Sequence, residues 1–172
     1  SLVTNTAGKT VFPVPNGAVR DVVVRGSRLY IGGAFTAVGT TSRGMLAALD
    51  RDSGALLPDV NVPFAGTYNG GATNIKRFDI SPDGRKLVAV GNFTSADGQA
   101  RSQIVKYNLG LSNATLSPWF TNLFNQACSS KFDTYLTDVE YSPNGQFFIV
   151  STTGAYGGTA SKSLAAGLHI AW

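Results

Sequence analysis

The sequence predicts an all-β protein built from repeats, and three observations support this fold class. Charged side chains make up only 14% of its 172 residues, against about a quarter in average globular chains. Short apolar runs alternate with turn residues, and the 3.6-residue apolar period of amphipathic helices is absent from the pattern. The third observation is a strand–turn–strand unit that recurs along the chain.

The repeated unit is a predicted β-hairpin. "DVVVRGSRLYIGGAFT" at 21–36 aligns without a gap on "DISPDGRKLVAVGNFT" at 79–94. "EYSPNGQFFIVSTTGA" at 140–155 follows after a similar interval. The Pro and Gly positions of "SPDG" and "SPNG" suit a type I turn, so each unit is expected to form two antiparallel strands.

Two further strands follow each hairpin. "GMLAALDRDSGALLP" at 44–58 matches "SQIVKYNLGLSNATLSP" at 102–118, while "SLVTNTAGKTVFP" at 1–13 has the same form. "GLHIAW" at 167–172 resembles the opening half of that pattern. Repeats of this length with four short strands are typical of β-propeller blades. The sequence therefore predicts about three blades of four antiparallel strands, as a fragment of a larger ring.

The repeats also give expected boundaries and expected partners. Residues 1–16 would end a preceding blade, 17–74 and 75–135 would each form a blade, and 136–172 would form a truncated blade. The remaining blades of the same protein, or another chain, are expected to cover the exposed sheet edges. Glycines at the ends of the second strands are expected where inner strands converge and their backbones approach closely.

The first repeat resembles a known family. "LYIGGAFTAVGTTSRGMLAALDRDSG" is similar to the delta-sixty-type propeller repeats of secreted and cell-surface bacterial proteins, whose pattern reads roughly LYxGGxF, a Gly-containing loop, Arg, LAxLD and a turn. The second repeat keeps Gly91, Phe93, Arg101 and Val105. The resemblance implies an extracellular or cell-surface location and a non-catalytic binding or scaffold role within a larger protein. The matching residues of the first repeat are Leu29, Tyr30, Gly32, Gly33, Phe35, Arg43, Leu46, Ala47, Leu49, Asp50 and Gly54.

The long connections of such a fold would lie on one face, where a rigid scaffold usually carries its binding residues. A glycan or protein ligand is expected there. The alternative to ligand contact is that Trp119 and Phe120 fold inward and fill the gaps between blades. Large aromatic rings contribute most to stability when they are buried. The long connections are 37–42, 59–74, 95–100, 119–135 and 155–161. The candidate ligand contacts on them are Tyr68, Asn69, Trp119 and Tyr156.

Acidic and basic residues recur at fixed positions of the aligned repeats. One acid in each repeat precedes the hairpin turn, and one cation precedes the third strand. We expect structural ion pairs within or between blades, with a ring of cations lining a site as the alternative. The acids are Asp21, Asp79 and Glu140, and the cations are Arg43, Arg101 and Lys162.

The sequence predicts no catalytic residues, metal or cofactor. Its one histidine, His169, lies in an alternating strand, and no Ser/His/Asp set or metal-ligand spacing can be drawn. The net charge of +4 comes from scattered cations, so no nucleic-acid partner is expected. The apolar runs fall short of the ~18 residues of a membrane span.

The alternative function is that the chain is part of a carbohydrate-active propeller enzyme. Its catalytic residues would lie partly in missing blades, and Asp97 and Asp133 would be the carboxylates that this chain supplies.

Overall fold

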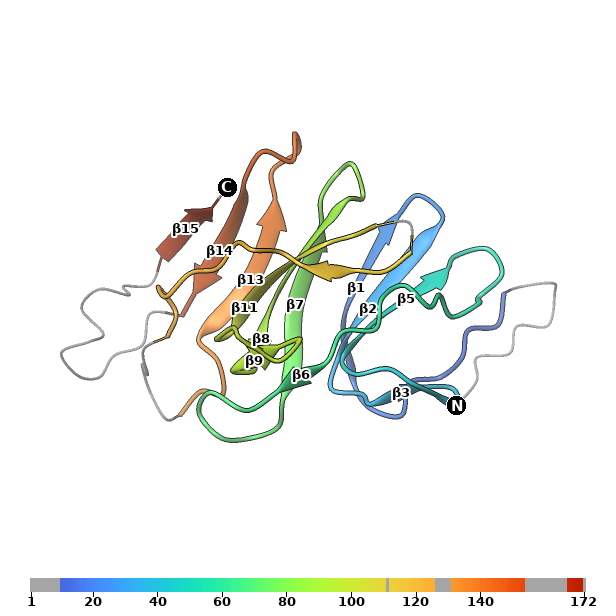
Figure 1. The fold of residues 1–172 in the computed structure, drawn as a ribbon, viewed down its shortest axis with the longest axis horizontal. Helices are drawn as coiled ribbons and strands as arrows, with labels where there is room; N and C mark the ends of the chain where they lie inside the picture. Colours follow the sequence, from blue (N-terminus) through green and yellow to red (C-terminus); the bar gives the residue numbers. More distant parts are fainter. Residues whose placement is uncertain (1–9, 111, 126–130, 154–166, 172) are drawn as a thin grey trace.

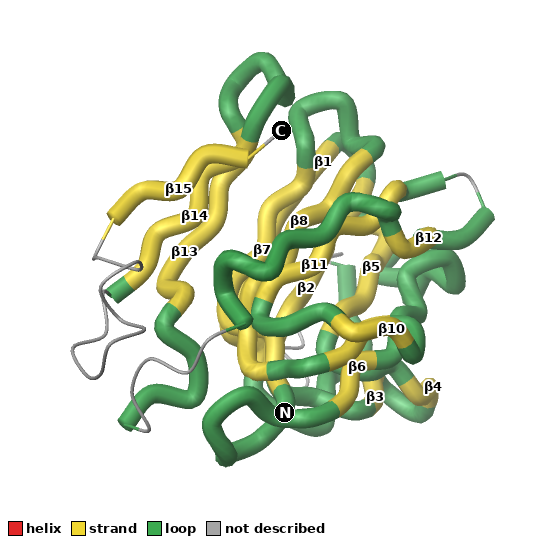
Figure 2. The backbone as a smooth tube through the Cα atoms, turned by 60° about the vertical axis from the view of Figure 1, so that its left-hand side comes forward, coloured by secondary structure: helices red, strands yellow, loops and turns green. Residues whose placement is uncertain are grey.

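The computed structural model describes residues 10–110, 112–125 and 131–153, together with the backbone of 167–171. These parts of the chain contain strands, turns and loops, and none of them is helical (Figure 2). All strand pairs are antiparallel. The predicted all-β class is therefore confirmed for the described residues.

The first sheet contains β1 (Val19–Arg25), β2 (Arg28–Gly33) and β5 (Leu46–Asp50), in that order. A two-residue turn joins β1 to β2, and its Gly26 has a φ of 58°. Glycine suits this left-handed position because it has no Cβ that would clash with the backbone. An isolated bridge from Leu56 extends the sheet beyond β5.

The second sheet contains β7 (Asn74–Ile80), β8 (Lys86–Asn92), β11 (Ile104–Asn108) and β12 (Thr115–Leu116). Each strand pairs with the next of these four strands, so the sheet is a simple meander from β7 at one edge to β12 at the other. The four strands of the second predicted repeat therefore share one sheet.

The third sheet contains β13 (Leu136–Tyr141), β14 (Phe148–Thr152) and β15 (Gly167–Ala171) and follows the same order of pairing. Its first hairpin turn repeats the hydrogen bonds of the turn between β7 and β8. The Ser81 hydroxyl donates to Asp83 Oδ1 at 2.6 Å, and the equivalent Ser142 hydroxyl lies 2.8 Å from Asn144 Oδ1. The hairpins predicted from "SPDG" and "SPNG" are confirmed.

In the described parts of the chain, five short strands lie outside the three main sheets, in the connections between their strands. β3 (Ala37–Val38) pairs with β4 (Thr41–Ser42), while β9 (Ser95–Ala96) pairs with both β10 (Gln99–Ala100) and β6 (Phe64–Ala65). Two of the connections that the sequence predicts to be long are therefore tight hairpins. They turn the chain between the second and third strand of the first two repeats.

The three main sheets pack side by side through their first strands, with β7 in contact with both β1 and β13 (Figure 1). One hydrophobic cluster joins the first sheet to the second and includes Leu87 and Ala89 of β8. Another joins the second sheet to the third and includes Val88 and Val90 of the same strand. β8 is thus buried on both faces, which explains its continuous apolar sequence.

The glycines that end the second strands mark close approaches of the backbone. A Cβ on Gly33 would overlap the carbonyl oxygen of Ala18, and one on Gly91 would overlap that of Asn74. Both carbonyls belong to segments at the start of first strands, β1 and β7. Close backbone approach is therefore found, but it is with the first strand of the same sheet and not, as expected, where inner strands of different blades converge.

The register corrects the gap-free alignment of the first strands. In the gap-free alignment, Tyr30 corresponds to Val88 and Asp21 corresponds to Asp79. In the structure, Val88 does pair with Asp79, but Tyr30 pairs with Val23 and not with Asp21. The two-residue turn after β1 is shorter than the loop after β7, so the first strands are offset by two residues. Asp21 lies at the level of Arg77, and not at the level of Asp79.

The predicted ion pairs of Asp21 with Arg43 and of Asp79 with Arg101 are not found among the described residues. Asp21 Oδ2 instead accepts the backbone N–H of Phe78 at 2.9 Å, which links β1 to β7. Asp79 forms an ion pair with Arg25 of the first sheet at 3.5 Å.

The repeated arginines bind the backbone that precedes them. Arg43 Nη1 donates to the Ser42 carbonyl at 2.9 Å, and Arg101 Nη1 donates to the Ala100 carbonyl at 2.8 Å. Glu140 is exposed, and Lys162 lies outside the described residues. Both arginines therefore hold the backbone just before the third strands.

Candidate functional site

The connections between repeats gather at one edge of the sheets. In Figure 1 the loops before β7 and β13 and the strand β9 lie at the lower edge, whereas the hairpin turns of the three main sheets lie at the upper edge. We call the lower edge the long-loop face and define it by residues 66–73, 95–100 and 131–135. The predicted gathering on one face is therefore found for these three segments, which are parts of the connections 59–74, 95–100 and 119–135.

A cavity of about 270 Å³ adjoins the long-loop face between β10 and the loop that follows β12. Phe120 forms one side of it, and the side chain is 60% exposed although phenylalanine is usually buried. We call this site the Phe120 cavity. Its lining residues are Gln99, Ala100, Arg101, Phe120, Thr121, Asn122 and Asn125.

Arg101 is fixed beside the Phe120 ring. Its guanidinium donates to the carbonyls of Ala100 at 2.8 Å and of Ser117 at 3.3 Å, and to Gln99 Oε1 at 3.4 Å. The guanidinium carbon lies 5.6 Å from the centre of the Phe120 ring, within the range of a cation–π interaction. These contacts hold both the charge and the ring in place.

The loop that carries Phe120 is anchored to the core. Buried Gln103 donates from Nε2 to the carbonyl of Phe124 at 2.7 Å, and the Phe124 side chain is only 2% exposed. Asn125 donates from Nδ2 to Asn122 Oδ1 at 2.7 Å, which holds a local turn within the loop. Because the loop is held by the scaffold, the cavity needs little ordering when a ligand binds.

The lining combines an exposed aromatic face with planar polar groups. The amides of Gln99, Asn122 and Asn125 supply both donors and acceptors, and the guanidinium supplies donors only. Such a set suits a neutral ligand with one apolar face and several hydroxyl groups, because the ring covers the first and the amides pair with the second. The sequence analysis missed these three amides, although "FTNLFNQ" places two of them close after the aromatic residue.

Trp119 and Phe120 have different surroundings although they are adjacent. Trp119 is half-buried and packs edge-on against Phe148, with ring centres 5.3 Å apart. Lys106 Nζ lies 6.0 Å from the centre of the Trp119 ring. Trp119 therefore seals the cluster between the second and third sheets, as the sealing alternative predicts, whereas sealing is wrong for Phe120.

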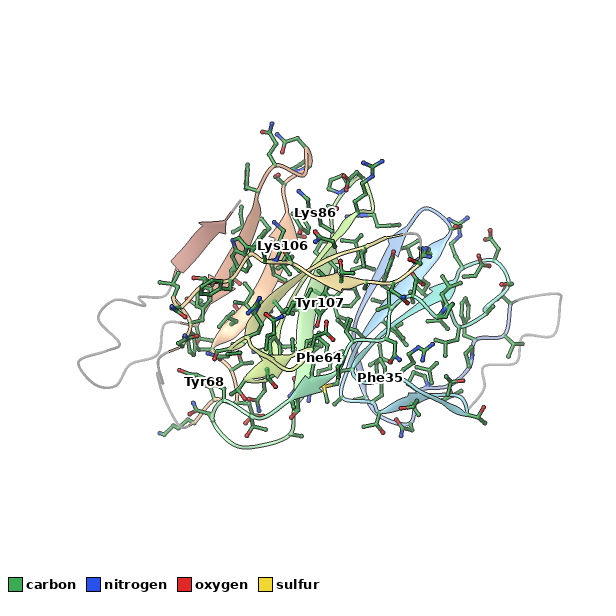
Figure 3. All side chains as sticks on the ribbon, in the orientation of Figure 1. Phe35, Phe64, Tyr68, Lys86, Lys106 and Tyr107 are labelled. Carbon is green, nitrogen blue, oxygen red and sulfur yellow. The ribbon has the colours of Figure 1, made fainter. Side chains whose placement is uncertain are left out.

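Tyr68 and Asn69 hold the loop before β7. Tyr68 is half-buried at the lower edge of the molecule (Figure 3), and its ring meets Tyr135 edge-on at 6.0 Å. Asn69 Nδ2 donates to the carbonyl of Phe132 at 2.9 Å. As a candidate ligand contact, the Tyr68 ring would be exposed; it instead packs on the cluster between the second and third sheets. Tyr156 lies outside the described residues.

The two carboxylates of the enzyme alternative have different settings. Asp97 occupies the turn between β9 and β10 with a φ of 49°, and burial raises its pKa. Asp133 lines a separate cavity together with Arg20 and Lys76. Within the described ranges, no group of three His, Cys, Asp or Glu side chains could hold a metal ion. No helix there is long and apolar enough to cross a membrane.

No protein-family model matches the sequence, and no curated protein matches it.

Proposed function

We propose that this chain is part of an extracellular β-propeller whose three main sheets are blades, and that it acts as a non-catalytic binding or scaffold module. Two features support the propeller. Each sheet is an antiparallel meander in chain order, and the first strands of the three sheets lie side by side. This combination is typical of blades around an axis.

The outer face of β1 supports a further blade. Val22 and Val24 are 52% and 45% exposed. Their equivalents in β7, once the offset of the first strands is included, are Phe78 and Ile80, which are 2% and 0% exposed and pack against the first sheet. A preceding sheet would bury the two valines in the same way. Another blade of the same protein, or another chain, would supply it.

The Phe120 cavity supports a carbohydrate as the ligand, and its exposed ring is the observation that carries this proposal. A sugar ring would place its apolar face on Phe120, while its hydroxyl groups bind the amides of Gln99 and Asn122 and the guanidinium of Arg101. Because these groups lie on an anchored loop and a short hairpin, they are positioned before the ligand arrives.

The test is binding of the purified chain to a glycan array, followed by calorimetric titration of the strongest neutral glycan. Phe120→Ala removes the apolar platform, and we expect it to weaken binding by about tenfold or more. Leu123→Ala is the matched control, because Leu123 is 44% exposed on the same loop but lies outside the cavity lining. The proposal is overturned if no glycan binds, or if both variants bind as the unsubstituted chain does.

A further inference from the structure

The three first strands share an irregularity near their starts. The register shifts between Val19 and Asp21 in β1, between Ile75 and Arg77 in β7, and between Leu136 and Asp138 in β13. Each shift is a β-bulge, which re-aims a side chain and is common beside functional sites. The bulged residues are Arg20, Lys76 and Thr137.

Two of these bulged residues line one cavity of about 290 Å³ on the long-loop face. Arg20 enters it from β1 and Lys76 from β7, and Lys131 contributes from the loop before β13. We call this site the cationic cavity. Its lining residues are Arg20, Asn74, Lys76, Lys131, Phe132, Asp133 and Thr134.

The charges of the cationic cavity do not balance. Three cations face one carboxylate, that of Asp133, so positive charge is in excess. Burial lowers the pKa of Lys76, as do the positive charges of Arg77 and Arg20, whereas Asp133 acts in the opposite direction. Lys76 is half-buried, whereas Arg20 and Lys131 are exposed. All three line one cavity, so a bound anion would relieve the repulsion between them.

The floor of the cavity is polar and buried. Thr134 and Asn74 are only 6% and 5% exposed. Asn74 Nδ2 is held by the Ala72 carbonyl at 2.8 Å. Thr134 Oγ1 accepts the backbone N–H of Leu136 at 3.2 Å, and no acceptor for its own proton is found in the described part of the chain. The cavity lining thus combines a hydroxyl with a guanidinium and two ammonium groups, which are donors that oxyanions prefer.

We propose that the cationic cavity binds a compact oxyanion, namely a sulfate, phosphate or carboxylate group carried by a ligand. Two of these cations come from equivalent bulges on adjacent first strands, and all three line one cavity together with the buried Thr134. The site is separate from the Phe120 cavity, and it does not depend on the carbohydrate proposal.

The test is calorimetric titration of the full chain with sodium sulfate, sodium phosphate and sodium glucuronate, at an ionic strength held constant with sodium chloride. Arg20→Gln and Lys76→Gln each remove one converging charge. We expect each substitution to lower the affinity for the most tightly bound of the three anions by about tenfold or more. Arg85→Gln is the matched control, because it removes the same positive charge at a different place. Arg85 is exposed in the hairpin turn at the end of β7 that is opposite to the cavity.

The outcomes separate the chemical sources. Strongest binding of sulfate or phosphate identifies a tetrahedral oxyanion, and strongest binding of glucuronate identifies a carboxylate on a sugar. Phe120→Ala should leave all three affinities unchanged, so failure of the carbohydrate proposal would not affect this result. The proposal is overturned if none of the three anions shows saturable binding, or if Arg85→Gln weakens binding as much as Arg20→Gln.

Discussion

Asp79 of β7 accepts the backbone N–H of Tyr141 of β13 at 2.7 Å, so one carboxylate joins strands of two different sheets. The same side chain also accepts the N–H of Ile80 at 2.8 Å and forms an ion pair with Arg25 of the first sheet at 3.5 Å. Asp79 is only 9% exposed. All three main sheets therefore meet at a single buried acid.

Asp79→Ala should lower the free energy of unfolding by about 2–4 kcal/mol, because it leaves the Tyr141 N–H without its charged acceptor in a buried place. Asp79→Asn keeps one carbonyl oxygen and should lose less. Urea denaturation measures both. Asp52→Ala is the control, because Asp52 forms an exposed ion pair with Arg51 that should contribute less than about 1 kcal/mol. Equal losses for Asp79→Ala and Asp52→Ala would contradict the linking role of Asp79.

The strands and hairpins could be predicted from sequence because their signals are local, but the offset of the first strand could not. Side chains alternate between the two faces of a strand, so a shift of two residues leaves the apolar pattern unchanged. Asp21 and Asp79 align as acids before a turn, yet Arg77 lies at the level of Asp21. The pairing of Asp79 with Arg25 depends on contacts between sheets, which no local pattern records.

The candidate site could be predicted only as a region. The expected order of strands in a blade places the long connections on one face, but it does not show which of two adjacent aromatic residues packs inward. Trp119 is fixed by Phe148 and Lys106, which are distant in sequence, and this leaves Phe120 exposed. The cavity around Phe120 likewise depends on the tight hairpin of β9 and β10, where the sequence predicts a long connection.

Gly33→Ala should destabilise the chain by roughly 1–3 kcal/mol or more, because its Cβ would overlap the Ala18 carbonyl oxygen and force the backbone apart. Gly44→Ala is the matched control, since a Cβ there meets nothing within 4 Å and its φ is not in the left-handed region. Thermal unfolding of both variants compares them directly. A Gly33→Ala variant as stable as Gly44→Ala would show that the backbones can separate at no cost.

Asp97→Asn should stabilise the chain at neutral pH. Burial raises the pKa of Asp97, so its charged form is disfavoured in the folded state. The free-energy cost of burying the charged Asp97 side chain is present above the folded pKa. It disappears as the pH falls from the folded pKa to the unfolded pKa. Asparagine carries no charge at any pH and so has no such cost. Asparagine also tolerates the positive φ of this turn. Urea denaturation at pH 7 should show a gain below about 1 kcal/mol, because the site is partly exposed. A gain that persists unchanged at pH 3 would contradict this cause.

Asp83→Asn should show the opposite dependence on pH. The Ser81 hydroxyl donates to Asp83 at 2.6 Å and the Arg85 N–H donates at 3.0 Å, and these hydrogen bonds lower the pKa of the carboxyl group. Because the folded pKa lies below the unfolded one, the contribution of Asp83 to stability is present above the unfolded pKa and is lost as pH falls through the folded pKa.

Asparagine in this turn keeps the geometry, since Asn144 accepts the same hydrogen bonds from Ser142 and from the Gln146 N–H in the third sheet. Asp83→Asn should therefore cost less than about 1 kcal/mol at pH 7 and nothing at low pH. Asn144→Asp is the reciprocal variant, and it should stabilise the chain at pH 7 and lose this gain on acidification. Denaturation curves at pH 7 and pH 3 test both changes. Loss of stability at pH 7 in both variants would show that packing, and not charge, distinguishes the two turns.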